Sequence, residues 1–239
     1  MLLSNEQQIL KLNTGKITMS LNWKEIDSVF LDLDGTLLDL HFDNHFWLEH
    51  VPLRYSEKRG LSIAEAKSEL FSRYRAIEGT LEWYCVEHWS RELDLDIVQL
   101  KREVAHLIAV HPHVIDFLEA VVTLSKRLLL VTNAHQHSLK LKLERTALGG
   151  YFDRIISAHD LKIAKETPTF WSHFQMIEPF DPKRTLFIDD NLNVLYQAQR
   201  FGIRWLVAAM TPDSTTVRRH INHEFLAIGD FSELLPMSL

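Results

Sequence analysis

Two kinds of hydrophobic pattern alternate along the second half of this chain. Short continuous apolar runs predict buried strands, and longer stretches with apolar positions three and four residues apart predict helices between them. Continuously apolar strands that alternate with helices are typical of a parallel sheet covered by helices on both faces. We expect strands at residues 28–32, 127–131, 154–157, 185–188, 204–207 and 225–228, and helices at 114–126, 136–148, 169–177 and 192–201.

The pattern differs between residues 41 and 110. Residues 63–74 and 81–93 show helical periodicity, no convincing strand lies between them, and half of the six tryptophans fall here. We therefore predict an α/β fold, Rossmann-like with a mainly parallel sheet, that is interrupted by a helical insertion with its own core. The predicted domains are a polar N-terminal arm at 1–22, an α/β core formed by 23–40 and 111–239, and a helical cap at 41–110.

Two helix ends in the core are predicted from local sequence. Gly149 and Gly150 are expected to end the helix at 136–148, since glycine tolerates the left-handed conformation that often follows a helix. Thr167 is a candidate N-cap, with Pro168 as the first residue of the next helix.

Composition excludes several classes of protein. The 239 residues include 26 Lys and Arg against 32 Asp and Glu, and this net charge of −6 argues against a sequence-independent nucleic-acid binder. No stretch is long and apolar enough to span a membrane, and no signal peptide is evident, so we expect a cytoplasmic protein. The single cysteine, Cys85, cannot form an internal disulfide. No obligate protein partner is evident.

The strongest chemical signal is the sequence Asp32-Leu33-Asp34-Gly35-Thr36 directly after a predicted buried strand. Residues i and i+2 of a strand point the same way, so both carboxylates can face one cavity. One carboxylate can then act as a nucleophile while the other transfers a proton. Two close anions need a hard cation such as Mg²⁺ to remain ionised. A turn or capping role is the alternative.

The chain also contains a second pair of acids with this spacing. Asp94 and Asp96 lack the following glycine and lie in the helical segment, so we interpret them as a solvated face or as helix-end residues.

A further acidic pair, Asp189 and Asp190, closes the apolar run at 185–188. Buried unpaired acids are costly, and a cation at this position would compensate them. The alternative is that Asp190 or Asn191 simply caps the helix at 192–201.

Two weaker signals involve phosphate. Thr132 and Asn133 follow the strand at 127–131, where a hydroxyl and backbone N–H groups can bind phosphate oxygens, although an asparagine turn is the alternative. Lys165 precedes a predicted helix and can neutralise an anionic site, but a lone lysine is usually a surface residue. In open α/β sheets ligands bind at the carboxyl ends of the strands, so these groups are expected to converge there.

These four motifs, in this order, resemble the haloacid dehalogenase (HAD) superfamily of phosphohydrolases, over about residues 28–210. The helical segment falls where that superfamily inserts a C1-type cap. The chain more specifically resembles the bacterial GMP/IMP nucleotidase branch, which dephosphorylates purine 5′-mononucleotides. The motifs that carry this resemblance are 37–40 (LLDL), 42–44 (FDN), 46–47 (FW), 83–85 (WYC) and 133–135 (NAH).

The resemblance implies a role for each motif residue. Asp32 would be the nucleophile that forms an aspartyl-phosphate, and Asp34 would protonate the leaving oxygen and later activate water. Thr132 and the backbone around Asn133 would bind the phosphoryl group, and Lys165 would offset charge on Asp32 and the phosphate.

The resemblance also implies the metal site. Mg²⁺ would be held by Asp32, the Asp34 backbone carbonyl and Asp190. Asp189 stands where relatives carry glycine or an acid, so it is a further candidate ligand. Many relatives carry another acid a few residues later, where this chain has Asn193 and Val194. His135 can contact the substrate. Haloacid dehalogenases lack the second aspartate of the first motif, so Asp34 favours phosphoryl transfer.

Several alternatives remain open. The aromatic residues Phe42, Phe46 and Trp47 could stack on a purine, although packing within the helical segment is the stronger interpretation. Zinc is disfavoured because no Cys or His set with structural-zinc spacing accompanies His111/His113 or His135/His137. The function classes are a Mg²⁺-dependent phosphatase of small phosphomonoesters, including sugar phosphates; a phosphomutase; and a non-catalytic binding protein of the same fold.

Overall fold

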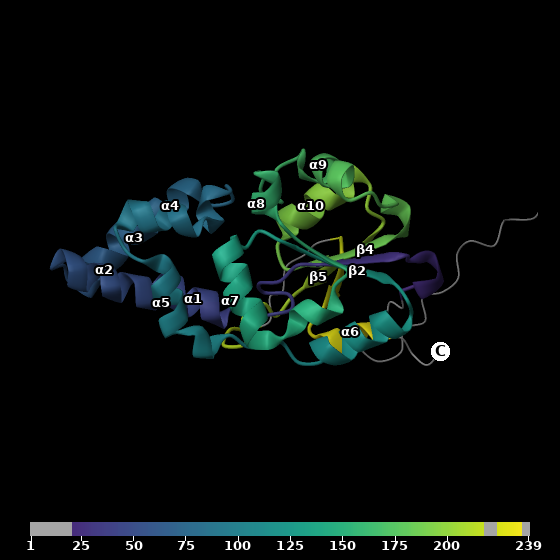
Figure 1. The fold of residues 1–239 in the computed structure, drawn as a ribbon, viewed down its shortest axis with the longest axis horizontal. Helices are drawn as coiled ribbons and strands as arrows, with labels where there is room; N and C mark the ends of the chain where they lie inside the picture. The colour runs from purple at the N-terminus through teal and green to yellow at the C-terminus, as the bar shows by residue number, and fades with distance from the viewer. Residues whose placement is uncertain (1–20, 218–223, 236–239) are drawn as a thin grey trace, which may run out of the picture.

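A computed structural model describes residues 21–217 and 224–235 of the chain. The polar arm predicted at residues 1–22 therefore lies almost entirely outside the described residues. Within the described ranges, no helix is both long and apolar enough to cross a membrane. Figure 1 shows a group of helices at one end of the molecule and a sheet flanked by helices at the other.

Six parallel strands form a single sheet in the order β3-β2-β1-β4-β5-β6. β1 lies inside the sheet, where Val29 pairs with Leu128 on one side and with Leu186 on the other, and all four of its residues are buried. The predicted α/β fold with a parallel sheet is thus confirmed. The strands are β1 (Ser28–Leu31), β2 (Arg127–Thr132), β3 (Arg154–Ser157), β4 (Thr185–Asp189), β5 (Trp205–Ala209) and β6 (Leu226–Ile228).

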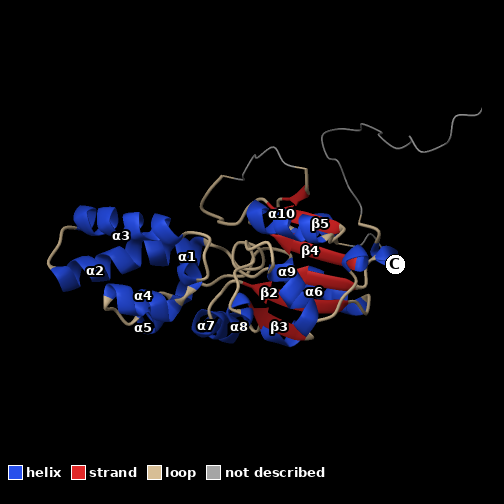
Figure 2. Cartoon of the chain, turned by 90° about the horizontal axis from the view of Figure 1, so that it is seen from above, coloured by secondary structure: helices blue, strands red, loops and turns tan. Residues whose placement is uncertain are grey.

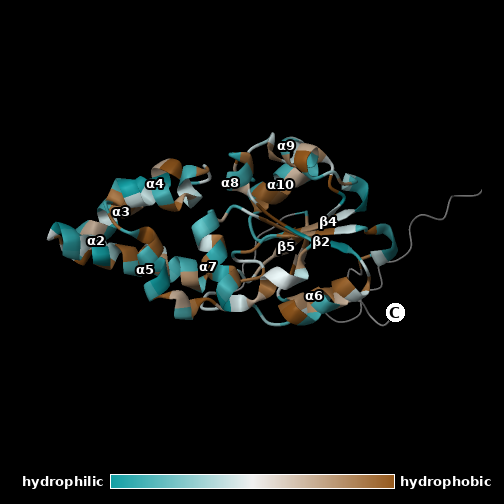
Figure 3. Cartoon of the chain, in the orientation of Figure 1, coloured by the Kyte–Doolittle hydropathy of each residue, from teal (hydrophilic) through white to brown (hydrophobic). Residues whose placement is uncertain are grey.

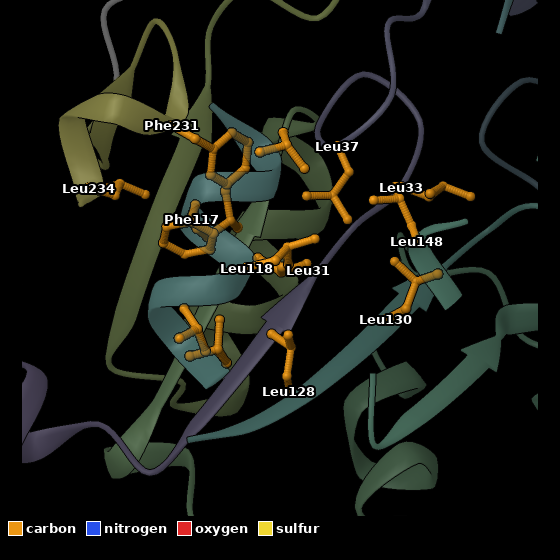
Figure 4. Packing of buried hydrophobic residues seen from close by; sticks show 14 of the residues in the cluster. Leu31, Leu33, Leu37, Phe117, Leu118, Leu128, Leu130, Leu148, Phe231 and Leu234 are labelled. Atoms are coloured by element: carbon orange, nitrogen blue, oxygen red, sulfur yellow. The ribbon is translucent and has the colours of Figure 1, made fainter. Parts of the chain in front are cut away.

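Helices cover both faces of this sheet (Figures 1 and 2). Alternate residues of β1 enter different cores: Leu31 packs with Phe117 and Leu118, as Figure 4 shows, whereas Phe30 stacks on Trp171 with ring centroids 6.3 Å apart. Figure 3 shows hydrophobic and hydrophilic residues on both α6 and α9, as expected for helices with one side against a sheet. The helices are α6 (Val114–Thr123) and α7 (Gln136–Thr146) on one face, and α8 (Ala158–Leu161), α9 (Phe170–Ile177) and α10 (Leu192–Phe201) on the other.

The helices between β1 and α6 form what we call the helical insertion. Its core includes Leu70, Trp89 and the fully buried Phe46, and Phe42 is 1% exposed, so packing is confirmed for these two phenylalanines. The boundaries of the insertion as a separate domain stay a prediction. Its helices are α1 (His41–His45), which continues through a π-helical turn (Phe46–His50) into α2 (Val51–Arg59), then α3 (Ile63–Ile77), α4 (Val86–Leu93) and α5 (Ile97–Glu103).

The helix predicted at residues 81–93 is shorter than expected. A 3₁₀ turn (Glu82–Tyr84) comes first, and α4 begins only at Val86 because Cys85 has extended backbone angles. The Cys85 thiol accepts a hydrogen bond from the His88 N–H at 3.4 Å and so caps α4. Further 3₁₀ segments are Trp23–Glu25, Ala105–Leu107, Leu148–Tyr151, Pro182–Arg184 and Phe231–Leu234.

Two chain segments join the insertion to the sheet, and we call them the neck: residues 37–39 and 109–111. They run antiparallel, with a bridge between Leu38 and Val110. The Asp39 N–H donates to the Ala109 carbonyl, and the His111 N–H donates to the Leu37 carbonyl, each at 2.9 Å. The outward and return passes of the chain are therefore tied together immediately after the first acidic motif.

Two predicted helix ends are wrong. α7 ends at Thr146 with Ala147 in the left-handed conformation, and this earlier turn places Leu148 in the core with no exposed surface, while Gly149 and Gly150 continue a 3₁₀ turn. α9 begins at Phe170 rather than Pro168, because the Thr167 carbonyl accepts from the Phe170 N–H in a preceding turn.

Candidate active site

The acidic motifs meet where three neighbouring strands end. Asp32 follows β1, Thr132 is the last residue of β2, and Asp189 is the last residue of β4. A cavity of about 510 Å³ lies at this edge and is lined by residues of the strand ends and of the helical insertion. Its volume suits a small-molecule ligand. All eight residues that the sequence singled out line this cavity: Asp32, Asp34, Thr132, Asn133, His135, Lys165, Asp189 and Asp190.

Lys165 is the central cation of the site. Its ammonium group is 2.5 Å from Asp32 Oδ1 and 2.7 Å from Asp189 Oδ2, and it also donates to the Val131 carbonyl at 3.1 Å. Burial alone would lower the pKa of Lys165, but the carboxylates of Asp189 and Asp32 raise it above its usual value. Lys165 is therefore charged in this site, and it is not the surface residue that was the alternative.

Asn133 holds the Lys165 loop in place. Its Oδ1 accepts from the Lys165 N–H at 2.9 Å, and its Nδ2 donates to Glu166 Oε2 at 2.9 Å. Thr132 Oγ1 accepts from the Ala134 N–H at 3.0 Å, which fixes the chain just beyond β2. The side chain of Asn133 thus positions Lys165, while the Thr132 hydroxyl still has a proton to donate.

Three carboxylates form a group that could hold a metal ion. Asp32, Asp189 and Asp190 each offer an oxygen within 4.8 Å of the others. Burial raises the pKa of Asp189 well above its usual value; Lys165 opposes this shift, and the charges of Asp32 and Asp190 add to it. Clustered hard oxygen donors with excess negative charge suit Mg²⁺. Both oxygens of Asp189 already accept hydrogen bonds, one from Lys165 and one from the Asn191 N–H at 2.8 Å.

Gly35 lets the first acidic motif approach Asp190. Its φ is +82°, and a Cβ at this position would lie 2.9 Å from Asp190 Cγ. Gly60 has a similar φ of +68°, but among the described residues no atom beyond its chain neighbours lies within 4 Å of a Cβ built there. We expect Gly35→Ala to lower the free energy of unfolding by about 1–3 kcal/mol more than Gly60→Ala, since only Gly35→Ala adds a steric clash. Urea denaturation of both variants measures this difference, and equal losses would contradict the close approach.

Asp34 belongs to a chain of alternating charges that the sequence did not reveal. Lys142 Nζ lies 2.7 Å from Asp34 Oδ1 and 2.6 Å from Asp43 Oδ2, and Lys101 Nζ lies 2.9 Å from Asp43 Oδ1. Burial raises the pKa of Asp34 to about 6, with Lys142 opposing the shift. Burial would also raise the pKa of Asp43, but the two ammonium groups lower it to about 2. This series of paired charges connects the sheet side of the cavity to the insertion.

The sequence contains a feature that indicates a buried lysine at Lys101, but none that does so at Lys142. Lys101 continues the apolar stripe formed by Ile97, Leu100 and Val104, and a lysine at such a position indicates a buried charge that needs a partner. Nothing local distinguishes Lys142 from Lys140, the other lysine of α7.

Glu166 is a further residue that the sequence analysis missed. It accepts hydrogen bonds from Tyr84 Oη at 2.6 Å, Asn133 Nδ2 at 2.9 Å and Asn191 Nδ2 at 3.1 Å. Tyr84 belongs to the helical insertion, so Glu166 joins the insertion to two strand ends. Its position directly after Lys165 was the only clue in the sequence.

The remaining sequence predictions have mixed outcomes. Asn191, rather than Asp190, caps α10. Asp94 ends α4 in the left-handed conformation and Asp96 caps α5, which confirms their interpretation as helix-end residues. Trp47 lines the cavity as well as contacting the core of the insertion.

Comparisons with known proteins agree with this geometry. The family model described as haloacid dehalogenase-like hydrolase matches residues 26–230. The GMP/IMP nucleotidase YrfG of Escherichia coli K12 is 36% identical over 218 residues, which is 91% of this chain and 98% of that protein. The pyrophosphatase PpaX of Oceanobacillus iheyensis is 23% identical over 220 residues, covering 89% of this chain and 96% of that protein.

Solved structures show the same fold. A HAD phosphatase from Thermococcus onnurineus superposes with a TM-score of 0.74 at 25% identity, covering 87% of this chain and 95% of that one. The predicted resemblance to the superfamily and to its GMP/IMP nucleotidase branch is confirmed at the level of sequence similarity.

Proposed function

Because this chain belongs to the haloacid dehalogenase-like hydrolase family, we propose that it hydrolyses small phosphomonoesters with the help of Mg²⁺, and that its substrates are purine 5′-mononucleotides such as GMP and IMP. The observation that carries this proposal is the convergence of Asp32, Asp34 and Lys165 on one cavity. The family assignment makes the chain a hydrolase, so the non-catalytic alternative is set aside. The cytoplasmic location stays a prediction.

Asp32 is the nucleophile of the proposed reaction. Asp32 is 5% exposed, and its carboxylate accepts a hydrogen bond from the Lys165 ammonium group at 2.5 Å, which orients it. Attack of one carboxylate oxygen on phosphorus breaks the ester bond and gives an aspartyl-phosphate. Water then attacks this acyl phosphate, which releases phosphate and restores Asp32.

Asp34 transfers the protons in both half-reactions. A carboxyl group with a pKa of about 6 can donate to the leaving alcohol and later accept from water near neutral pH. Lys142, 2.7 Å from Asp34 Oδ1, orients this group.

The phosphoryl group is bound between the strand ends. The Thr132 hydroxyl and the backbone N–H groups that follow β2 supply donors, and Lys165 adds a positive charge. Asn133 contributes by holding the Lys165 loop.

Mg²⁺ would be held by Asp32, the Asp34 backbone carbonyl and Asp190. Asp189 is less suited to be a ligand, since both of its oxygens already accept hydrogen bonds. The ion would neutralise phosphoryl oxygens as a Lewis acid.

The purine base would lie against the helical insertion. Trp47, Trp83 and Tyr84 line the cavity from that side and offer flat apolar surfaces, on which stacking of a base contributes about 1–3 kcal/mol. The similarity to a GMP/IMP nucleotidase supports this choice over sugar phosphates.

A substrate panel tests the proposal. Phosphate release is measured with GMP, IMP, AMP, sugar phosphates and p-nitrophenyl phosphate, each with Mg²⁺ and with EDTA. We expect EDTA to abolish all turnover, and kcat/KM for GMP and IMP to exceed that for sugar phosphates at least about tenfold, equal to about 1.4 kcal/mol of stacking. A preference for sugar phosphates, or conversion of a sugar phosphate to its isomer without phosphate release, would contradict the nucleotidase assignment.

A further inference from the structure

Three potential metal ligands that are distant in the sequence meet at the boundary between the insertion and the sheet. Cys85, His135 and His159 each offer one ligand atom, and these atoms lie within 4.8 Å of one another. We call them the Cys–His cluster. Cys85 precedes α4 in the insertion, His135 precedes α7, and His159 lies in α8. The rings of the two histidines meet edge to face with centroids 4.7 Å apart.

We propose that the Cys–His cluster binds a thiophilic divalent cation such as Zn²⁺, and that the bound ion ties the helical insertion to the sheet. The sequence disfavoured zinc because no suitable spacing was present, but here the fold assembles the ligands from three separate elements. A thiolate with two imidazoles is a donor set that Zn²⁺ prefers, unlike the hard carboxylates around Asp32.

The spacing is compatible with a tetrahedral ion. Zn²⁺ lies about 2.3 Å from sulfur and about 2.0–2.1 Å from imidazole nitrogen, so its ligand atoms are about 3.3–3.7 Å apart. The ligand atoms of the cluster lie within 4.8 Å of one another, so they would move closer together on binding the ion.

Glu87 can supply the fourth ligand. Its Oε2 lies 2.6 Å from His135 Nε2 and 3.7 Å from Cys85 Sγ, so a carboxylate already stands beside the cluster. The four side chains would then complete the coordination of the ion.

His159 has a ring nitrogen that is suited to bind the cation. Its Nε2 is buried, and among the described residues it has no hydrogen-bond partner. A buried ring nitrogen without a partner, beside a thiol and a second imidazole, is available to bind a metal ion.

A bound ion would slow the exchange of substrate and product. Cys85 follows Tyr84, which lines the cavity and donates to Glu166, and His135 also lines the cavity. An ion between Cys85 and the two histidines would hold the insertion against the sheet beside the cavity, and such closure limits turnover in many enzymes. This consequence rests on the proposed phosphatase function, whereas binding of the ion does not.

Cobalt provides a direct test with the reduced full-length protein. Cys85 is the only cysteine of the chain, so a thiolate-to-cobalt charge-transfer band can arise only at this site even if Co²⁺ also binds the carboxylates. We expect the band in the wild type, its displacement by one equivalent of Zn²⁺, and its absence in Cys85→Ser. His159→Gln should weaken cobalt binding at least about tenfold.

His137→Gln is the matched control. His137 Nε2 lies 3.4 Å from Glu87 Oε1, but His137 is not part of the cluster, so this variant should bind cobalt like the wild type. No charge-transfer band at saturating Co²⁺, or a band equally strong in His159→Gln, would overturn the site. Circular dichroism and size-exclusion chromatography confirm that each variant is folded and that cobalt does not bridge two molecules.

Inhibition tests the consequence separately. With Mg²⁺ in excess, Zn²⁺ should inhibit phosphate release by the wild type and His137→Gln much more than by Cys85→Ser. Equal inhibition of Cys85→Ser would overturn the proposed link to turnover. Failure of the phosphatase assignment would show as absence of turnover with every substrate, and it would leave the cobalt band unchanged.

Discussion

Replacing Asp32 with asparagine is expected to lower kcat for phosphate release by at least about 10³-fold while the protein remains folded. The amide cannot attack phosphorus, but its oxygen can still accept the hydrogen bond that Lys165 now donates to Asp32 at 2.5 Å. The measurement is single-turnover and steady-state phosphate release with GMP, together with a thermal melt. Turnover within tenfold of the wild type would contradict the role of Asp32 as the nucleophile.

Asp96→Asn is the control for this substitution. Asp96 belongs to the second pair of acids with the same spacing, but its side chain caps α5 by accepting from the Gln99 N–H at 2.9 Å. Asparagine caps helices about as well as aspartate, so both the melting temperature and kcat should remain close to those of the wild type.

Replacing Lys165 with methionine is expected to destabilise the protein by about 3–5 kcal/mol and to abolish turnover. The ammonium group bridges two buried carboxylates, those of Asp32 and Asp189, and its loss leaves them without their shared cation. Methionine has a similar volume, so the loss would report charge rather than a cavity. Urea unfolding gives the change in free energy, and phosphate release gives the activity.

Lys140→Met separates this effect from any general effect of removing a lysine. Lys140 is 77% exposed and lies 3.9 Å from Glu144, so its replacement should change the free energy of unfolding by less than about 0.5 kcal/mol. Similar losses for both variants would mean that the buried pairs contribute little.

The sheet and its functional edge were predictable because each depends on local sequence. A buried strand such as β4 needs a continuous apolar run, and Asp189 marks its end. Once the strands are known to be parallel, their carboxyl ends must share one edge, so Asp32, Thr132 and Asp189 can be brought together without any long-range contact being known.

The contacts between the insertion and the sheet were not predictable in this way. Lys142 bonds to Asp43, which lies 99 positions away in the sequence, and no short-range pattern encodes that pairing. The same is true of Tyr84 with Glu166 and of Cys85 with His159. The two wrong helix ends have a different cause: burial of Leu148 and a local turn at Thr167 outweigh the usual preferences of glycine and proline.

The neck determines how the insertion could swing. Its two segments, residues 37–39 and 109–111, are joined by two backbone hydrogen bonds. Rotation of the insertion relative to the sheet would therefore take place about the neck as one double-stranded unit. The Gly35 N–H also donates a hydrogen bond to the Leu38 carbonyl at 2.8 Å. This bond connects the neck to the loop that carries Asp34. Movement of the insertion about the neck would therefore also displace the loop that carries Asp34, so that admission of a ligand and the position of this carboxylate would be coupled.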